Sequence, residues 1–208
     1  DTAAATAAGP LPLDAGARGW ALVAGALALL PLLLTLPSAL GLGLGLAAAA
    51  TAAIAWRHPF PAWLRVALTL AMIAAVFAVM GTRLGRDTGS ALLAAMLAIK
   101  PSELRNLRDA RSLVGFALFA PFAAFLLDQG PLVMASALLA VLAGLLALQR
   151  LADLEGGVAA LGLPQRLGTM GRLVAIGLPL ALAAFWLFPR PAVWRPGSAH
   201  RIDRKSVV

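Results

Sequence analysis

The chain has 208 residues, of which 61% are hydrophobic and 12% charged, and its mean hydropathy is +0.89. This composition excludes an ordinary soluble domain and is typical of an integral membrane protein. The formal net charge is +8, which we interpret as a record of membrane topology rather than as a nucleic-acid-binding surface, because basic residues accumulate beside the cytoplasmic ends of spanning helices. Cysteine is absent, which excludes disulfides, thiolate metal sites and a cysteine nucleophile from these residues.

Residues 1–19 are rich in Ala, Pro and Gly, and we expect them to be disordered or loosely held at the membrane surface. The remainder contains several long apolar runs rather than one, which excludes a signal peptide followed by a soluble domain. The runs predict an all-α, polytopic transmembrane bundle of about seven spans. These spans cover residues 20–36, 39–56, 63–80, 84–100, 112–127, 132–148 and 173–188.

The second run contains Gly41, Gly43 and Gly45. A G-x-G-x-G pattern can suggest a nucleotide-binding loop, but here no strand precedes it and the third glycine of the dinucleotide fingerprint is missing. Gly41 and Gly45 are four residues apart, so they share one face of a helix. The spacing predicts a close helix contact rather than phosphate binding.

The fourth run is short, because only eleven residues, Gly89–Ile99, separate two charged clusters. They would make about 16 Å of helix, whereas a bilayer core is about 30 Å thick. We therefore expect the helix to begin near Leu84, with Arg86 at headgroup depth and with Arg83 and Asp87 paired at i,i+4. The alternative is a segment that enters and leaves the membrane without crossing it.

Pro101 is expected to end or kink this fourth helix, and Ser102–Arg111 is expected to form a short polar helix at the membrane surface. Three arginines of that segment, Arg105, Arg108 and Arg111, make up a predicted basic collar facing the lipid headgroups.

Basic residues divide unequally between the two predicted sides of the membrane. By the positive-inside rule the richer side is cytoplasmic, which places the N-terminus inside and the C-terminus outside. The five Trp residues agree, because each lies at the predicted end of a run, where indoles prefer the interface. The richer side holds Arg18, Arg57, Arg65, Lys100, Arg105, Arg108, Arg111, Arg150, Arg166 and Arg172, and the other holds Arg83, Arg86, Arg190 and Arg195.

Charged residues next to the membrane are candidates for function, because charges are costly within it. Arg83, Lys100 and Glu103 form one candidate polar site. A second hypothesis for the function is a small transporter or lipid-binding protein in which Arg83, Arg86 and Asp87 line a polar cavity. The structural alternative is that Arg86 and Asp87 only brace the start of a helix. His58 has no partner at metal-ligand spacing, so we predict no metal site.

Four segments carry a resemblance to a known family: PLLLTLP (31–37), GTRLGRDTGSALLAAMLAIK (81–100), ELRNLRDA (103–110) and LPLALAAFWLFPRP (178–191). Over residues 20–197 the chain resembles the membrane-embedded N-terminal domain of bacterial TgpA-type transglutaminase-like proteins. Its most specific element is G-R-D/E-x-G, which Gly85, Arg86, Asp87 and Gly89 supply. Pro101 departs from the family pattern.

The resemblance implies a multi-pass protein of the bacterial inner membrane, with the lipid bilayer as its surroundings. It also implies a periplasmic transglutaminase-like domain, with a Cys-His-Asp triad, after the FPRP exit at residues 188–191. The expected function is therefore a non-catalytic anchor or scaffold without a cofactor. The oligomeric state and the substrate of the parent protein stay open.

The two ends of the chain do not fit this pattern. The chain starts at Asp1 rather than at Met, and we expect the true N-terminus to lie upstream. Residues 198–208 do not look like the family's continuation, and Asp203–Val208 can be back-translated to the read-through of a sequencing adapter. We expect this tail to be artefactual.

Overall fold

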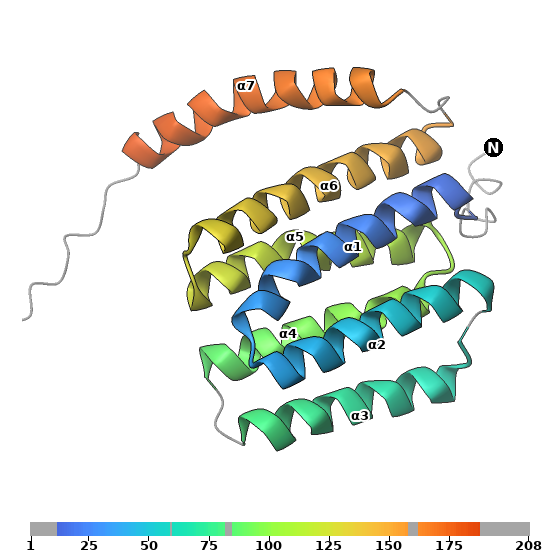
Figure 1. Cartoon of the computed structure of the whole chain (residues 1–208). Helices are drawn as coiled ribbons and strands as arrows, with labels where there is room; N and C mark the ends of the chain where they lie inside the picture. Colours follow the sequence, from blue (N-terminus) through green and yellow to red (C-terminus); the bar gives the residue numbers. More distant parts are fainter. Residues whose placement is uncertain (1–11, 59, 82–84, 158–161, 188–208) are drawn as a thin grey trace, which may run out of the picture. The chain divides into compact units, whose positions relative to one another are not determined.

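The computed structural model describes residues 12–58, 60–81, 85–157 and 162–187, and their regular structure is helical (Figure 1). Two compact units are distinguished, Asp1–Leu167 and Gly168–Val208, and the helical bundle is the first of them. The described residues form seven α-helices and one 3₁₀ helix: α1 (Ala15–Thr35), α2 (Ser38–Arg57), α3 (Ala62–Met80), α4 (Arg86–Ile99), η2 (Lys100–Glu103), α5 (Leu107–Leu127), α6 (Pro131–Glu155) and α7 (Leu163–Leu187).

Six of the seven α-helices, all except α4, are long and apolar enough to cross a membrane. Large hydrophobic side chains lie exposed on their outer faces, among them Leu46 on α2, Leu70 on α3 and Phe119 on α5. Exposed apolar belts of this kind are expected where lipid, rather than water, surrounds the helices. The prediction of an all-α bundle of membrane-spanning helices is therefore confirmed.

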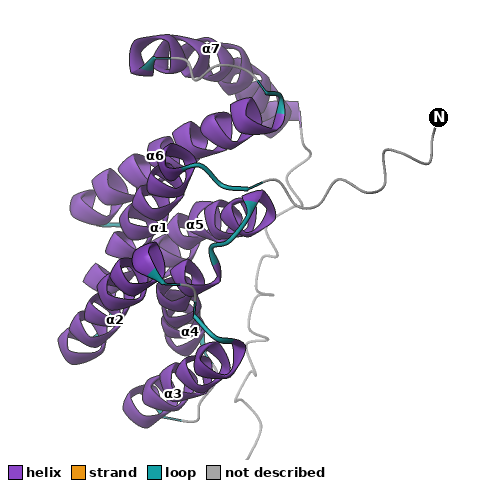
Figure 2. Ribbon diagram, turned by 90° about the vertical axis from the view of Figure 1, so that its right-hand side faces the viewer, coloured by secondary structure: helices purple, strands orange, loops and turns teal. Residues whose placement is uncertain are grey.

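Helix α1 is central to the bundle and packs against α2, α4, α5 and α6 (Figures 1 and 2). Its buried residues include Ala17, Ala21, Ala24 and Ala28, all fully buried. These residues recur every three or four positions and so occupy one helix face. Small side chains let neighbouring helices approach closely, which is how helices gain packing energy in a membrane.

The glycine-based contact between α1 and α2 is confirmed. A Cβ atom added to Gly41 would lie 2.8 Å from the backbone oxygen of Leu33, and one added to Gly45 would lie 3.2 Å from a methyl group of the same residue. A Cβ at Gly43 would meet nothing within 4 Å. The two glycines four residues apart therefore face α1, whereas the glycine between them does not.

Helices α1 to α6 alternate in direction, so their connections gather at two ends (Figure 1). We call one the Arg18 end; it contains the start of α1, the α2–α3 connection, the η2–α5 connection and the end of α6. The other, the Pro37 end, contains the α1–α2, α3–α4 and α5–α6 connections.

Helix α4 has 14 residues and is extended by the four residues of η2. At about 1.5 Å per α-helical and 2 Å per 3₁₀ residue, the two together rise about 29 Å, close to the thickness of a bilayer core. Leu104, the C-cap of η2, accepts a hydrogen bond from Arg18 Nη2 at 2.8 Å. The pair α4–η2 thus runs from the Pro37 end to the Arg18 end, unlike a segment that enters and returns on one side.

Pro101 ends α4 as predicted, but the segment after it differs from the prediction. Instead of a separate polar helix over Ser102–Arg111, the chain passes through η2 and an extended Leu104 into α5. Asn106 and Asp109 form a capping box that starts α5 at Leu107. Nothing interrupts the helix after Arg111, so the polar first turn and the apolar run form one helix.

The helices also extend beyond the predicted apolar runs. Helix α1 begins at Ala15, so disorder over residues 15–19 is wrong, because the Asp14 carboxylate accepts a hydrogen bond from Ala17 N at 2.6 Å and caps the helix. Helix α6 continues to Glu155 and α7 begins at Leu163. Hydropathy detects only the part of a helix in lipid, whereas caps decide where its backbone begins. Residues 1–11 and the tail 198–208 lie outside the described residues.

Candidate functional site

The G-R-D-x-G element lies at the start of α4, at the Pro37 end. Gly85 is the N-cap and its oxygen accepts a hydrogen bond from Gly89 N at 2.9 Å. Arg86 Nε and a carboxylate oxygen of Asp87 are 3.8 Å apart, with side chains 72% and 66% exposed. Such a pair contributes little energy, although Asp87 in the first turn complements the helix dipole.

This exposure bears on the transporter hypothesis. Residues that line a polar cavity are at least partly enclosed, whereas Arg86 and Asp87 are largely exposed. Arg83 and its predicted pairing with Asp87 lie outside the described residues. The geometry favours the interpretation of Arg86 and Asp87 as a brace at the helix start. A Cβ added to Gly85 or Gly89 would meet nothing within 4 Å, so the packing does not explain glycine at either position.

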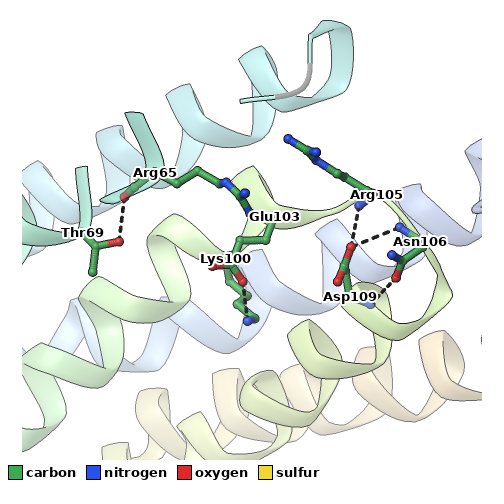
Figure 3. Close-up of polar contacts among 7 residues, drawn as sticks. All are labelled: Arg65, Thr69, Lys100, Glu103, Arg105, Asn106 and Asp109. Atoms are coloured by element: carbon green, nitrogen blue, oxygen red, sulfur yellow. Dashed lines mark hydrogen bonds and ion pairs between the residues drawn. The ribbon is translucent and has the colours of Figure 1, made fainter. Parts of the chain in front are cut away.

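Lys100 and Glu103 lie at the other end of the α4–η2 pair and form an ion pair of 2.5 Å (Figure 3). Their side chains are 22% and 39% exposed. The Lys100 ammonium also lies 5.4 Å from the centre of the Phe116 ring, within range of a cation–π contact. The structure therefore brings Lys100 and Glu103 together at the Arg18 end, whereas Arg86 lies at the Pro37 end.

The three arginines of the predicted basic collar have three different environments. Arg105 Nη2 donates a hydrogen bond of 2.6 Å to the carbonyl oxygen of Phe60, which links the start of α5 to the α2–α3 connection. Arg111 forms an ion pair with Glu155 at the end of α6. Arg108 is exposed. Two of the three thus hold helices together, although all three are exposed.

Sequence reasoning missed two further ion pairs at the Arg18 end. Asp14 pairs with Arg150, joining the start of α1 to α6, and Asp153 pairs with Arg166. Arg18 lies 5.8 Å from the Trp56 ring centre in addition to its bond to Leu104. The Asp14–Arg150 partners are 136 residues apart, and no spacing rule within one helix could have paired them.

A small pocket opens between α3 and η2 at the Arg18 end. It has a volume of about 360 Å³ and is lined by Ala62, Arg65, Val66, Thr69, Leu70 and Glu103. Arg65 Nε is buried and has no hydrogen-bond partner among the described residues, while the Thr69 hydroxyl donates to the Arg65 backbone oxygen. Figure 3 shows the Arg65 side chain extending from α3 toward Glu103. The sequence marked Arg65 only as a topological signal.

Catalytic chemistry has few candidate groups here. Among the described residues, no group of three or more His, Cys, Asp or Glu side chains could hold a metal ion. The whole chain lacks cysteine. Many of the described polar residues cap helices or join them in pairs, and Arg65 and Glu103 line the α3–η2 pocket.

Comparison with known proteins gives two matches. A family model described as the TgpA N-terminal domain matches residues 20–204, which includes part of the tail predicted to be atypical. A protein-glutamine gamma-glutamyltransferase of Pseudomonas aeruginosa is 36% identical over 176 residues. That match covers 82% of this chain but 25% of the enzyme, so the chain spans about a quarter of the length of this curated relative. No solved structure matches the chain.

Proposed function

Because the chain belongs to the TgpA N-terminal domain family, we propose that it is the membrane anchor of a transglutaminase-like protein, without catalytic activity of its own. In this proposal the anchor holds a transglutaminase-like domain at the periplasmic face of the bacterial inner membrane. The main support is that this chain matches one quarter of a much longer glutamyltransferase. The matching chain is composed largely of apolar helices.

The chemistry of the chain supports a division of labour. Acyl transfer through a thiol needs a cysteine nucleophile with a base beside it, and this chain has no cysteine. In this proposal, acyl transfer through a thiol is carried out by another part of the parent protein.

The charge distribution supports the proposed orientation. Within the first unit, the basic side chains of the described residues lie at the Arg18 end, with the exception of Arg86 at the Pro37 end. The positive-inside rule then makes the Arg18 end cytoplasmic. The Arg18 end holds Arg18, Arg57, Arg65, Lys100, Arg105, Arg108, Arg111, Arg150 and Arg166. Six helical passes from α1 to α6, with α4–η2 counted as one, return the chain to the cytoplasmic side, and α7 would be the seventh pass.

A reporter fusion tests the anchor function. Alkaline phosphatase, which is active only in the periplasm, would be fused after Leu187 and expressed in a Gram-negative host. We expect active enzyme that stays in the membrane fraction after carbonate extraction. A matched fusion after Gly157, on the cytoplasmic side in this scheme, should be membrane-bound and inactive. An inactive Leu187 fusion, or one released by carbonate, would rule out a periplasmic anchor.

A further inference from the structure

We propose that the pocket between α3 and η2 binds the headgroup of a phospholipid that carries a phosphate and a primary ammonium, as phosphatidylethanolamine does. In this site Arg65 donates to the phosphate and Glu103 accepts from the ammonium. The inference concerns the described bundle alone and is independent of the anchor function.

Arg65 has a side-chain donor, its buried Nε, without an acceptor among the described residues. Burying a polar group without a hydrogen bond is costly. Arginine is well suited to phosphate, because its planar guanidinium presents several donors to the phosphate oxygens. A phosphate in the pocket that Arg65 lines would offer its guanidinium acceptors that the described bundle does not supply.

An acidic side chain, Glu103, lines the η2 side of the pocket. Its carboxylate would repel a ligand that is only anionic. Lys100 already pairs with Glu103, but a carboxylate offers about four acceptor positions, so it can accept from a second ammonium as well. One cationic and one acidic wall fit a ligand with both charges.

An apolar surface of α3 adjoins these charged groups. Val66 and Leu70 line the pocket and are 60% and 61% exposed, on the outer face of α3. They lie one and two turns further along α3 than Ala62, in the direction of the bilayer centre. A lipid with its headgroup between Arg65 and Glu103 can therefore place its acyl chains along this apolar surface, where they exclude water from the polar contacts.

Lipid binding to the purified 208-residue chain tests the proposal. Short-chain phosphatidylethanolamine, phosphatidylcholine and phosphatidylglycerol would be titrated in detergent, and lipid-bound protein would be counted by native mass spectrometry. We expect phosphatidylethanolamine to bind most tightly. Phosphatidylcholine should be weaker because its trimethylammonium cannot donate a hydrogen bond, and phosphatidylglycerol should be weaker because it lacks the cation. Equal binding of all three, preference for phosphatidylglycerol, or no retained lipid would overturn the proposal.

Matched variants locate the site. Arg65→Gln and Glu103→Gln should each weaken phosphatidylethanolamine binding about tenfold, the loss expected for one charge-assisted hydrogen bond. Glu103→Gln should also remove the preference over phosphatidylcholine. Arg108→Gln changes an exposed arginine elsewhere at the same end and should bind like the parent chain.

A variant that fails to fold must be distinguished from one that fails to bind, because Glu103 also pairs with Lys100. Lys100→Gln breaks that ion pair but leaves both proposed ligand contacts, so it should retain lipid. Helicity by circular dichroism and a single elution peak check that each variant folds. Folded Arg65→Gln and Glu103→Gln chains that bind phosphatidylethanolamine with unchanged affinity would overturn the proposed site.

Discussion

Asp14 has two partners at once. Its carboxylate accepts from Ala17 N and so caps α1, and it pairs with Arg150 of α6, whose side chain is 15% exposed. A helix cap alone is worth about 1 kcal/mol. Removing one member of an enclosed ion pair costs more, since the other charge is left without a partner. Single residues at the Arg18 end thus combine local and long-range contacts.

We therefore expect Asp14→Ala to lower the free energy of unfolding by about 2 kcal/mol, since both contacts are lost. Asp14→Asn keeps an oxygen that can cap the helix but loses the charge, so its loss should be smaller. Unfolding of the purified chain by SDS in mixed micelles, followed by circular dichroism, measures both. Equal losses for the two variants would show that the cap contributes nothing.

At the scale of elements, helices pack by shape where small residues meet and by hydrogen bonds where a polar side chain crosses between them. Gly41 exemplifies the first, because its hydrogen faces the backbone of Leu33. Thr51 exemplifies the second, because its buried hydroxyl lies 2.7 Å from the oxygen of Ala98 and links α2 to α4. Both contacts hold α2 in place, one against α1 and one against α4.

Gly41→Ala should destabilise the bundle, because the added methyl group would meet a backbone oxygen that cannot rotate away. Overpacking of this kind costs about 1–3 kcal/mol. Gly43→Ala is the matched control on the same helix, and with open space around it should be neutral or slightly stabilising. The SDS unfolding midpoints of the two variants would be compared. A Gly43→Ala loss as large as that of Gly41→Ala would contradict the packing model.

Thr51→Val should lower the free energy of unfolding by about 0.5–1.5 kcal/mol, the range for a hydrogen bond between membrane helices. Thr69→Val removes a bond of 2.8 Å to Arg65 O within the same helix, and should cost less because no helix pair is separated. Thermal unfolding in detergent gives the comparison. The role of Thr51 between α2 and α4 is excluded if the two losses are the same.

At the scale of the whole molecule, the side of the membrane on which each connection lies depends on α4. If α4–η2 crosses, the Arg18 and Pro37 ends lie on opposite sides of the bilayer. If it did not cross, Arg86 and Arg108 would lie on the same side. The rise of about 29 Å for the two helices together suits a crossing.

The absence of cysteine makes this testable, since any introduced thiol is the only one in the chain. In intact spheroplasts, Arg86→Cys and Asp128→Cys should react with a membrane-impermeant maleimide. Arg108→Cys and Glu155→Cys should react only after the membrane is permeabilised. Labelling of Arg86→Cys and Arg108→Cys from the same side would exclude a crossing by α4.

Hydropathy determined the positions of the six long helices, because the apolar content of a spanning helix is a local property that lipid selects for. The spacing of Gly41 and Gly45 determined a packing face, and Pro101 determined where α4 ends. The sequence was less informative about helix starts, since the caps at Asp14 and Asn106 lie outside the apolar runs that hydropathy detects.

The tertiary structure alone decided which charges meet. Lys100 and Glu103 are close in the sequence. The other contacts join distant segments: Asp14 with Arg150, Arg111 with Glu155, and Arg105 with the Phe60 oxygen. They form only because the helices alternate in direction and bring four segments to one end. The pocket of Arg65 and Glu103 depends on the same arrangement. Polar contacts between distant segments have no local signature, because their distances are set by how the helices pack.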